Sequence, residues 1–418
     1  MAGQKIMERF ADMRDCTLCP RGCHADRTGA SVDVVPAPAG GACIGAGQTQ
    51  AGSARVDEVL APEGGARADT IQAPAGGVRA SAPRRPRGGF CQMPDTVTIA
   101  RAALHMWEEP CISGTSGSGT VFFSGCTLRC VFCQNYHIST EKKGYGVSIP
   151  RLADIFLELE EAGANNINLV TPTHFVPQII RALDLSRQKG LTLPVVYNTS
   201  GYEKVETLKM LEGYVDIYLP DFKYVDPVLS GKYSGAPDYF EKAAAALEEM
   251  VRQVPEAVFA AGQVAKDVGD GAPAAADVAD GASAPDDVVG GTPAAPNDVV
   301  AAVLMKRGVI VRHLMLPGCL LDSKRVVRYL YETYGDQIYL SLMNQYTPLP
   351  TLGEQYPELS CRVKKKSYEK LIQFALNLGV TNAFIQEGET AKESFIPDFD
   401  GQGVFEANGA EAGIKEKP

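Results

Sequence analysis

The chain has 418 residues, of which 45% are hydrophobic and eleven are cysteines, and its formal net charge at pH 7 is −10. Seven of the ten net negative charges come from residues 255–302, which contain eight acidic residues and one lysine. The remaining residues are therefore nearly neutral. Their charge predicts neither a nucleic-acid footprint nor a membrane-binding basic face. No apolar run approaches the ~20 residues of a membrane span, and an odd cysteine count with tight C-x2-C spacings argues against a secreted disulfide framework, so we expect a cytoplasmic protein.

The chain begins with a predicted cysteine-rich extension, residues 1–29 and 88–112, which residues 30–87 interrupt. The interruption is rich in Ala, Gly and Pro and has no sustained apolar period. This composition predicts a disordered, low-complexity insertion.

The extension carries a predicted metal site. Cys16, Cys19 and Cys23 have C-x2-C-x3-C spacing, so a fourth ligand must come from farther along the chain. Cys43 lies inside the low-complexity insertion, whereas Cys91 directly precedes a structured stretch. Four thiolates suit zinc as well as iron and sulfur, and a set of reduced thiols is the alternative.

The next element is a short apolar run, Thr120–Ser124, which predicts a β-strand. The loop after it carries Cys126, Cys130 and Cys133 at C-x3-C-x2-C spacing, and three thiolates so close together predict a metal cluster. A four-iron, four-sulfur cube normally takes four cysteine ligands, so three leave one iron open to a substrate or cofactor. A zinc site or an ordinary thiol cluster is the alternative.

From this strand onward, strand-like and helix-like stretches alternate. The predicted strands are Thr120–Ser124, Ile167–Val170, Pro194–Tyr197, Val215–Leu219, Val309–Met315 and Gln337–Leu342. The predicted helices are Pro150–Gly163, Val176–Lys189, Lys204–Leu211, Tyr239–Val251, Ser323–Tyr334 and Ser367–Leu378. Strict alternation implies parallel strands with right-handed crossovers. Six units are too few for a closed eightfold barrel, so we predict an α/β fold with a partial (βα)6 TIM-type barrel, and an open doubly wound sheet is the alternative.

The predicted barrel comprises residues 113–254 and 303–395. Between these parts, residues 255–302 repeat Ala, Gly, Pro, Asp and Val and predict a second, acidic low-complexity insertion without order. Residues 396–418 form a predicted tail. The expected organisation is therefore a barrel with a cysteine-rich, metal-binding N-terminal extension and two insertions.

Polar or turn residues follow every predicted strand. Thr171–His174 follow the second strand, Asn198–Tyr202 the third and Asp221–Lys223 the fourth. In βα barrels the working groups sit at the carboxyl ends of the strands. These segments are therefore predicted to gather around the cysteine loop.

At this point the residues resemble the radical S-adenosylmethionine (SAM) superfamily, whose signature is C-x3-C-x2-C with an aromatic residue before the last cysteine, here Phe132. Within it, the chain is most similar to the pyruvate formate-lyase-activating enzymes, especially an uncharacterised branch of activating-enzyme-like proteins. The resemblance covers the chain apart from the two insertions and the last residues. It is carried by Cys16–Cys23, Leu104–Gly114, Cys133–Tyr136, Asn166–His174 and Tyr218–Tyr224.

The resemblance implies a radical SAM oxidoreductase with a [4Fe-4S] cluster. The amino and carboxylate groups of SAM would chelate the open iron, and the reduced cluster would pass one electron to the sulfonium. Methionine would leave, and a 5'-deoxyadenosyl radical would abstract hydrogen from a substrate. The implied partners are an electron donor such as flavodoxin or ferredoxin and a substrate that is a small molecule or a protein, with a glycyl radical enzyme among the candidates.

The resemblance also assigns cofactor-binding residues. Asp221 and Lys223 match the Asp-x-Lys that activating enzymes carry near the cofactor, with a surface ion pair as the alternative. Asn198 stands where those enzymes have an aspartate. Thr171 stands where the superfamily often has Gly-Gly-Glu to hold the methionine amino group; its hydroxyl would accept a similar hydrogen bond, and a plain turn is the alternative.

Two other features bear on the site. In the related branch a Gly-x-Cys leads into a helix before His-x-Trp-Glu-Glu-Pro, which favours Cys91 as the fourth ligand of the N-terminal site. Glu108, Glu109 and Cys111, beside the only tryptophan, predict either an acid/base or radical role or an ion-paired loop with a buried thiol. No residue is assigned to the substrate chemistry itself.

The sequence thus supports two hypotheses of different classes. The first is a radical SAM enzyme that acts on a protein or a small molecule, with activation of a glycyl radical enzyme as one role. The second is an iron–sulfur electron-transfer or metal-binding scaffold that does not cleave SAM. Six strand ends that converge on the cluster favour the enzyme, because an electron carrier needs no such large mouth.

Overall fold

The computed structural model describes residues 13–28, 89–260, 303–386 and 397–405. The predicted insertion at 30–87 lies outside the described residues, as do the predicted acidic insertion beyond residue 260 and tail residues 406–418. The predicted disorder of the two insertions therefore stays a prediction.

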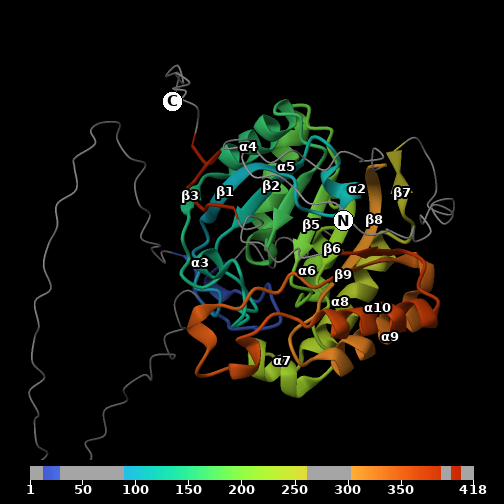
Figure 1. Ribbon diagram of the computed structural model, residues 1–418. Coiled ribbons are helices and arrows are strands. Elements are labelled where there is room, and N and C mark those ends of the chain that lie inside the picture. The colour runs from blue at the N-terminus through green and yellow to red at the C-terminus, as the bar shows by residue number, and fades with distance from the viewer. Residues whose placement is uncertain (1–12, 29–88, 261–302, 387–396, 406–418) are drawn as a thin grey trace, which may run out of the picture. The chain divides into compact units, whose positions relative to one another are not determined.

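One sheet with the strand order β10-β9-β8-β6-β5-β4-β2-β1-β3 organises the fold (Figure 1). Its parallel strands are β2 (Ser118–Phe123), β4 (Ile167–Val170), β5 (Val195–Thr199), β6 (Ile217–Pro220), β8 (Met305–Leu314), β9 (Tyr339–Met343) and β10 (Ala383–Ile385). These strands lie in the order in which the chain makes them, without the reversal that defines a doubly wound sheet. The prediction of a partial βα barrel is confirmed, and the doubly wound alternative is wrong.

All six predicted parallel strands are present, and the described residues add a seventh. This strand, β10, has only three residues and pairs with β9. Three residues are too few for a periodic pattern, so no sequence signal marks this strand.

Antiparallel strands were absent from the prediction. β1 (Val97–His105) pairs with β2, β3 (Tyr145–Val147) pairs with β1, and β7 (Val258–Phe259) pairs with β8. The resemblance implied a helix where β1 lies, and this expectation is wrong, because the backbone pairs with β2 over nearly its whole length. β1 thus ties the predicted extension into the main sheet, and β7 carries the described fold past residue 255.

Helices cover the parallel strands. They are α2 (Pro110–Ser113), α3 (Tyr136–Ser139), α4 (Ile149–Glu161), α5 (Val176–Gln188), α6 (Val205–Met210), α7 (Pro227–Ser234), α8 (Tyr239–Gln253), α9 (Leu320–Tyr334) and α10 (Lys365–Leu378). Figure 1 shows α4 and α5 beside the β1 and β2 end of the sheet, and α9 and α10 near β9. No helix in the described ranges combines the length and apolar character needed to cross a membrane.

Local sequence explains the helix ends. α4 begins after Ser148, whose hydroxyl accepts a hydrogen bond from the Arg151 N–H, and Pro150 occupies its first turn. Residues 397–405, within the predicted tail, return to β1. There the Ala102 N–H donates to the Gln402 carbonyl at 2.8 Å, so this part of the tail belongs to the fold.

Candidate active site

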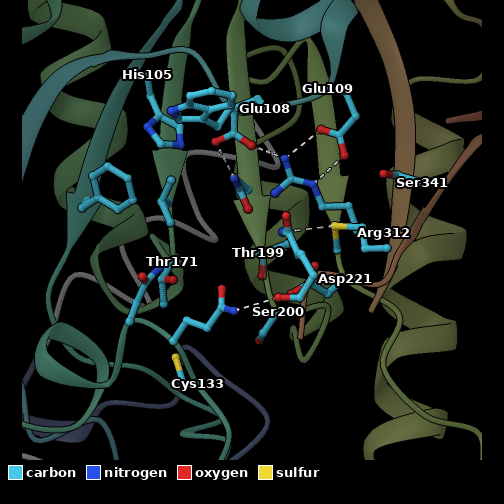
Figure 2. A pocket seen from close by; sticks show the side chains of 18 of the residues that line it. His105, Glu108, Glu109, Cys133, Thr171, Thr199, Ser200, Asp221, Arg312 and Ser341 are labelled. Atoms are coloured by element: carbon cyan, nitrogen blue, oxygen red, sulfur yellow. Dashed lines mark hydrogen bonds and ion pairs between the residues drawn. The ribbon is translucent and has the colours of Figure 1, made fainter. Parts of the chain in front are cut away.

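A cavity of about 740 Å³ opens at the carboxyl ends of the parallel strands (Figure 2). Residues that follow β2, β4, β5 and β6 line it, and so do side chains of β8 and β9. The segments that follow the strands therefore lie around the cysteine loop, as the sequence predicted. In Figure 2, Cys133 lies at one end of the cavity and the Glu108, Glu109 and Arg312 side chains lie at the other.

Cys126, Cys130 and Cys133 all line this cavity. The Cys126 Sγ accepts hydrogen bonds from the backbone N–H groups of Leu128 and Arg129, at 3.3 and 3.4 Å. Such donors are typical of sulfurs that hold iron–sulfur clusters, whose reduction potential depends on them. Burial raises the pKa of the Cys126 thiol.

Hydroxyl groups bind the other two sulfurs. The Ser234 hydroxyl donates to the Cys130 Sγ at 3.0 Å, and the Ser139 hydroxyl donates to the Cys133 Sγ at 3.4 Å. Burial raises the pKa of the Cys130 thiol to about 12 against the opposing effect of the nearby Lys223 ammonium. All three sulfurs therefore have an N–H or O–H donor and face one cavity, which fits ligands of a cluster.

Close packing fixes the start of the cysteine loop. Gly125, directly before Cys126, has a φ of +81°, and a Cβ there would lie 2.4 Å from the Met93 side chain. Its N–H donates to the Ile138 carbonyl at 2.8 Å. Only glycine fits this position, so the loop leaves β2 along one path.

Asp221 and Lys223 face the cavity beside the cysteine loop. The Lys223 Nζ lies 2.5 Å from the Asp221 Oδ2, and both side chains are largely buried. Burial alone would lower the pKa of Lys223, but the Asp221 carboxylate and Cys130 raise it above its usual value, so the ammonium stays charged. The pair lines the cavity and is no plain surface ion pair.

Tyr239 of α8 positions this pair. Its hydroxyl hydrogen-bonds the Ser200 and Asp221 carbonyls, at 2.8 and 3.0 Å, and the Lys223 N–H at 3.0 Å. Gly201 has a φ of +77°, and a Cβ there would lie 2.1 Å from the Asp221 carbonyl oxygen. The segments after β5 and β6 therefore touch through backbone atoms, and Tyr239 joins them.

Thr171 and Asn198 also line the cavity. Thr171 has a φ of +58°, a left-handed conformation that costs a β-branched residue about 1 to 3 kcal/mol and is found at turns and at functional sites. Its N–H donates to the Asn198 carbonyl at 2.9 Å. The structure thus brings together the two residues that the resemblance assigned to the cofactor.

A buried carboxyl group joins the segments that follow β4 and β5. Glu203 is 1% exposed and accepts hydrogen bonds from the Thr173 hydroxyl at 2.6 Å, from the Thr199 hydroxyl and from the Tyr197 hydroxyl at 3.5 Å. Burial raises the pKa of Glu203 to about 7, although the hydroxyl donors oppose this. No sequence pattern indicated Glu203.

At the other end of the cavity, Arg312 of β8 binds two carboxylates (Figure 2). It donates to both oxygens of Glu109, at 2.8 and 2.7 Å, and to Glu108. The Asn168 amide donates to Glu108 at 2.9 Å, and the Asn198 amide approaches it at 3.5 Å. Burial would raise the pKa of Glu109, but Arg312 holds it below its usual value.

The two glutamates therefore form the predicted ion-paired loop, and they also line the cavity. Their partner Arg312 was not predicted, although a charged residue inside the apolar strand β8 was a usable signal. Cys111 is buried, as that interpretation expected, whereas Trp107 is 58% exposed and lines the cavity.

Phe132 stands apart from the other predicted cofactor residues. Its side chain is 6% exposed, packs edge-on against Tyr346 at 6.4 Å between ring centroids, and is not among the residues that line the cavity. In the described residues it anchors the cysteine loop in the core, and direct contact with the cofactor stays a prediction.

The four cysteines of the predicted N-terminal site lie together. Cys16, Cys19 and Cys91 are buried and Cys23 is half-buried. Burial is the main reason why the pKa of the Cys19 thiol is raised, and the other three cysteines raise this pKa further. Cys91 is thus the cysteine that accompanies the first three, whereas Cys43 lies outside the described residues.

In the described part of the chain, no group of three or more His, Cys, Asp or Glu residues is arranged to hold a metal ion. The cysteines of an iron–sulfur cube bind different irons and stand farther apart than the ligands of one ion. For Cys126, Cys130 and Cys133 the donor set and spacing fit a cluster.

Fold and site together define a class of protein: a partial βα barrel with a three-cysteine loop after its first parallel strand and a buried Asp-Lys pair in the same cavity. The family model described as the Radical SAM superfamily matches residues 120–261, from β2 to just beyond β7. This match includes the three cysteines, so this part of the chain is similar to the Radical SAM superfamily.

A curated relative is the uncharacterized protein MJ0674 of Methanocaldococcus jannaschii, which is 32% identical over 161 residues. The match covers 36% of this chain and 45% of the relative, so the chain spans less than half of that protein's length. The activating-enzyme branch is not specified by either comparison.

Solved structures show more distant similarity. Methylornithine synthase PylB has 13% identity and a TM-score of 0.38, and the match covers 62% of this chain and 61% of that one. SuiB of Streptococcus suis bound to S-adenosylmethionine has 10% identity and a TM-score of 0.37, over 63% and 48%.

Proposed function

We propose that this protein cleaves SAM reductively in the described cavity and uses the resulting radical to abstract hydrogen from a substrate. One observation carries the proposal: the three-cysteine loop, the Asp221–Lys223 pair, Thr171 and Asn198 border one cavity. A [4Fe-4S] cluster bound there would supply one electron from a donor such as flavodoxin or ferredoxin, splitting SAM into methionine and a 5'-deoxyadenosyl radical that takes a hydrogen atom from the substrate.

The chain's own residues hold SAM in this proposal. Lys223, charged and close to Cys130, would donate to a carboxylate, and Asp221 would accept from ribose hydroxyls. The strained Thr171 and the neighbouring Asn198 would offer hydroxyl and amide groups to the polar parts of SAM. The buried strand-end walls would keep water from the reacting atoms.

The far end of the cavity would receive the substrate. Glu108, Glu109 and Arg312 form a rigid, charged wall there, away from Cys133 in Figure 2. Met106 and Trp107, 46% and 58% exposed, border the same cavity and present apolar surface to a partner. This rim favours a protein substrate over a small polar molecule.

The test is anaerobic reconstitution with iron and sulfide, reduction with dithionite, addition of SAM and measurement of 5'-deoxyadenosine. We expect product from the wild-type protein, none from Cys130→Ala, and product within about twofold of wild type from the matched control Cys361→Ala, an exposed cysteine. No product from fully loaded wild-type protein would reject the enzyme and leave the scaffold hypothesis.

A glycyl radical enzyme as the protein substrate is the more specific form of this proposal. Incubation of the reduced protein and SAM with a candidate glycyl radical enzyme would then give a glycyl radical signal in electron paramagnetic resonance spectra. The signal should depend on Cys130. Active SAM cleavage without any signal across the candidates would remove the activating role and keep the radical SAM enzyme.

A further inference from the structure

Arg27 is a fully buried cation in the N-terminal segment. It is 0% exposed, and its guanidinium donates to the carbonyls of Met93, Pro94 and His174, at 3.0, 2.5 and 2.5 Å. Within the described ranges no carboxylate pairs with it. An uncompensated buried charge costs several kcal/mol, so this position calls for a neighbouring anion.

The groups beside Arg27 that are able to become anions are cysteines. Its Nη1 lies 3.6 Å from the Cys16 Sγ, and its charge acts on Cys91 as well. Cys19 and Cys23 complete the group, since Cys19 interacts electrostatically with the other three. A Cβ on Gly89 would lie 2.8 Å from the Cys23 Sγ, which places the segment before Cys91 directly against that sulfur.

Backbone N–H groups lie close to two of these sulfurs. The Arg21 N–H hydrogen-bonds the Cys19 sulfur, and the Met93 N–H hydrogen-bonds the Cys91 sulfur, each from two positions along the chain. Cys126 shows the same pattern with Leu128. N–H donors stabilise a negative sulfur far more than a neutral thiol.

We propose that Cys16, Cys19, Cys23 and Cys91 hold a four-thiolate metal centre of net charge −2 and that Arg27 is its buried counter-charge. Four thiols release four protons to solvent when they bind one Zn²⁺ or one [4Fe-4S]²⁺ core, and either product carries two negative charges. Arg27 neutralises one of them. Zinc and an iron–sulfur core share this chemistry, and the experiment below distinguishes them.

The centre would lie against the three-cysteine loop of the cavity. Arg21 donates to the carbonyls of Thr127 and Leu128, at 3.0 and 3.4 Å. Arg27 holds the His174 carbonyl, and the His174 ring hydrogen-bonds the Ser124 carbonyl at 2.7 Å, two residues before Cys126. Loading the centre would therefore order the backbone from which Cys126 projects.

The inference stands without the proposed function, and its test avoids SAM. The full-length Cys126→Ala/Cys130→Ala/Cys133→Ala variant lacks the loop ligands, so metal that remains reports on the N-terminal site. Purified anaerobically and loaded with iron and sulfide, or with zinc alone, it should retain about four irons or about one zinc per chain. The metal that resists a chelator better in these two experiments is identified as the one the site holds. Occupancy below a fifth of the chains with both metals would overturn the proposal.

Further variants in this background test the ligands and Arg27 separately. Cys19→Ala and Cys91→Ala should each lose the metal, whereas Cys319→Ala, a half-buried cysteine outside the group, should keep it. Arg27→Gln should weaken metal affinity about tenfold or more in chelator competition, and Arg27→Lys should recover part of it. Equal affinity for Arg27→Gln and the parent, in protein that retains its helical circular dichroism, would overturn the role of Arg27.

Discussion

Arg312 is the residue on which the charged wall of the cavity depends. Its side chain is 13% exposed, and those of Glu108 and Glu109 are 7% and 5% exposed, so one cation balances two buried carboxylates. A buried pair of this kind adds little stability compared with apolar residues, but removing one partner leaves the other charge without compensation.

Arg312→Met should therefore lower the free energy of unfolding by about 3 to 5 kcal/mol, measured by urea denaturation of the metal-free protein. Arg328→Met is the control, because Arg328 is 56% exposed and 3.9 Å from Glu332, and it should change stability by less than about 1 kcal/mol. A loss below 1 kcal/mol for Arg312→Met would show that the carboxylates do not need it.

Glu203 makes stability depend on pH. Its pKa is raised by burial to about 7 in the folded protein, so between pH 4.5 and 7 the unfolded chain loses its proton while the folded chain keeps it. Stability contributed by this group therefore falls as pH rises through this window, by about 3 kcal/mol in total.

Glu203→Gln should remove this dependence. The difference in unfolding free energy between the variant and the wild type should shift in favour of the variant from pH 5 to pH 8, measured by urea denaturation of metal-free protein at four pH values. Because other titrating groups are common to both proteins, they cancel in the difference. A constant difference over this range would contradict the raised pKa.

At the scale of elements, the backbone contact between the segments after β5 and β6 positions the Asp221–Lys223 pair. Gly201→Ala would place a Cβ 2.1 Å from the Asp221 carbonyl oxygen and push the Asp221–Lys223 segment away. Gly213 is a matched control, with a φ of +82° and no atom within 4 Å of the added Cβ, so Gly213→Ala costs only the left-handed backbone, about 1 kcal/mol.

We expect Gly201→Ala to weaken SAM binding at least tenfold, measured by equilibrium dialysis against the reconstituted protein, and to lower Tm more than Gly213→Ala. Gly213→Ala should bind SAM as the wild type does. Equal SAM affinity in the two variants would mean that the backbone contact does not position Asp221 and Lys223.

At the scale of the whole molecule, metal binding should contribute to folding. The N-terminal cysteine group joins segments that are distant in the sequence, and a ligand that binds only the folded chain stabilises it by mass action. Reconstitution with iron and sulfide should raise Tm by several degrees in anaerobic scanning fluorimetry. The Cys126→Ala/Cys130→Ala/Cys133→Ala variant should show a smaller rise, and an unchanged Tm in the wild type would contradict this coupling.

The sequence by itself determined the alternation of parallel strands and helices, because burial on both faces gives long apolar runs of recognisable period. It also determined the three-cysteine loop and the Asp221–Lys223 pair, since their chemistry lies in local spacing. β10 and β7 escaped prediction because strands of three and two residues carry no period, and β1 because its strand character depends on pairing with β2.

Only the tertiary structure decided which distant charges meet. Arg312 lies more than 200 positions from Glu108 and Glu109 in the sequence. Glu203 accepts a hydrogen bond from Thr173, 30 positions away. Arg27 interacts electrostatically with Cys91, although residues 29–88 separate them in the sequence. No local pattern encodes such pairs, because they are selected by the cost of leaving a buried charge unpaired, and only the fold determines which charges are buried together. The sequence indicated the chemistry of the three-cysteine loop, and the fold supplied the surroundings in which it would work.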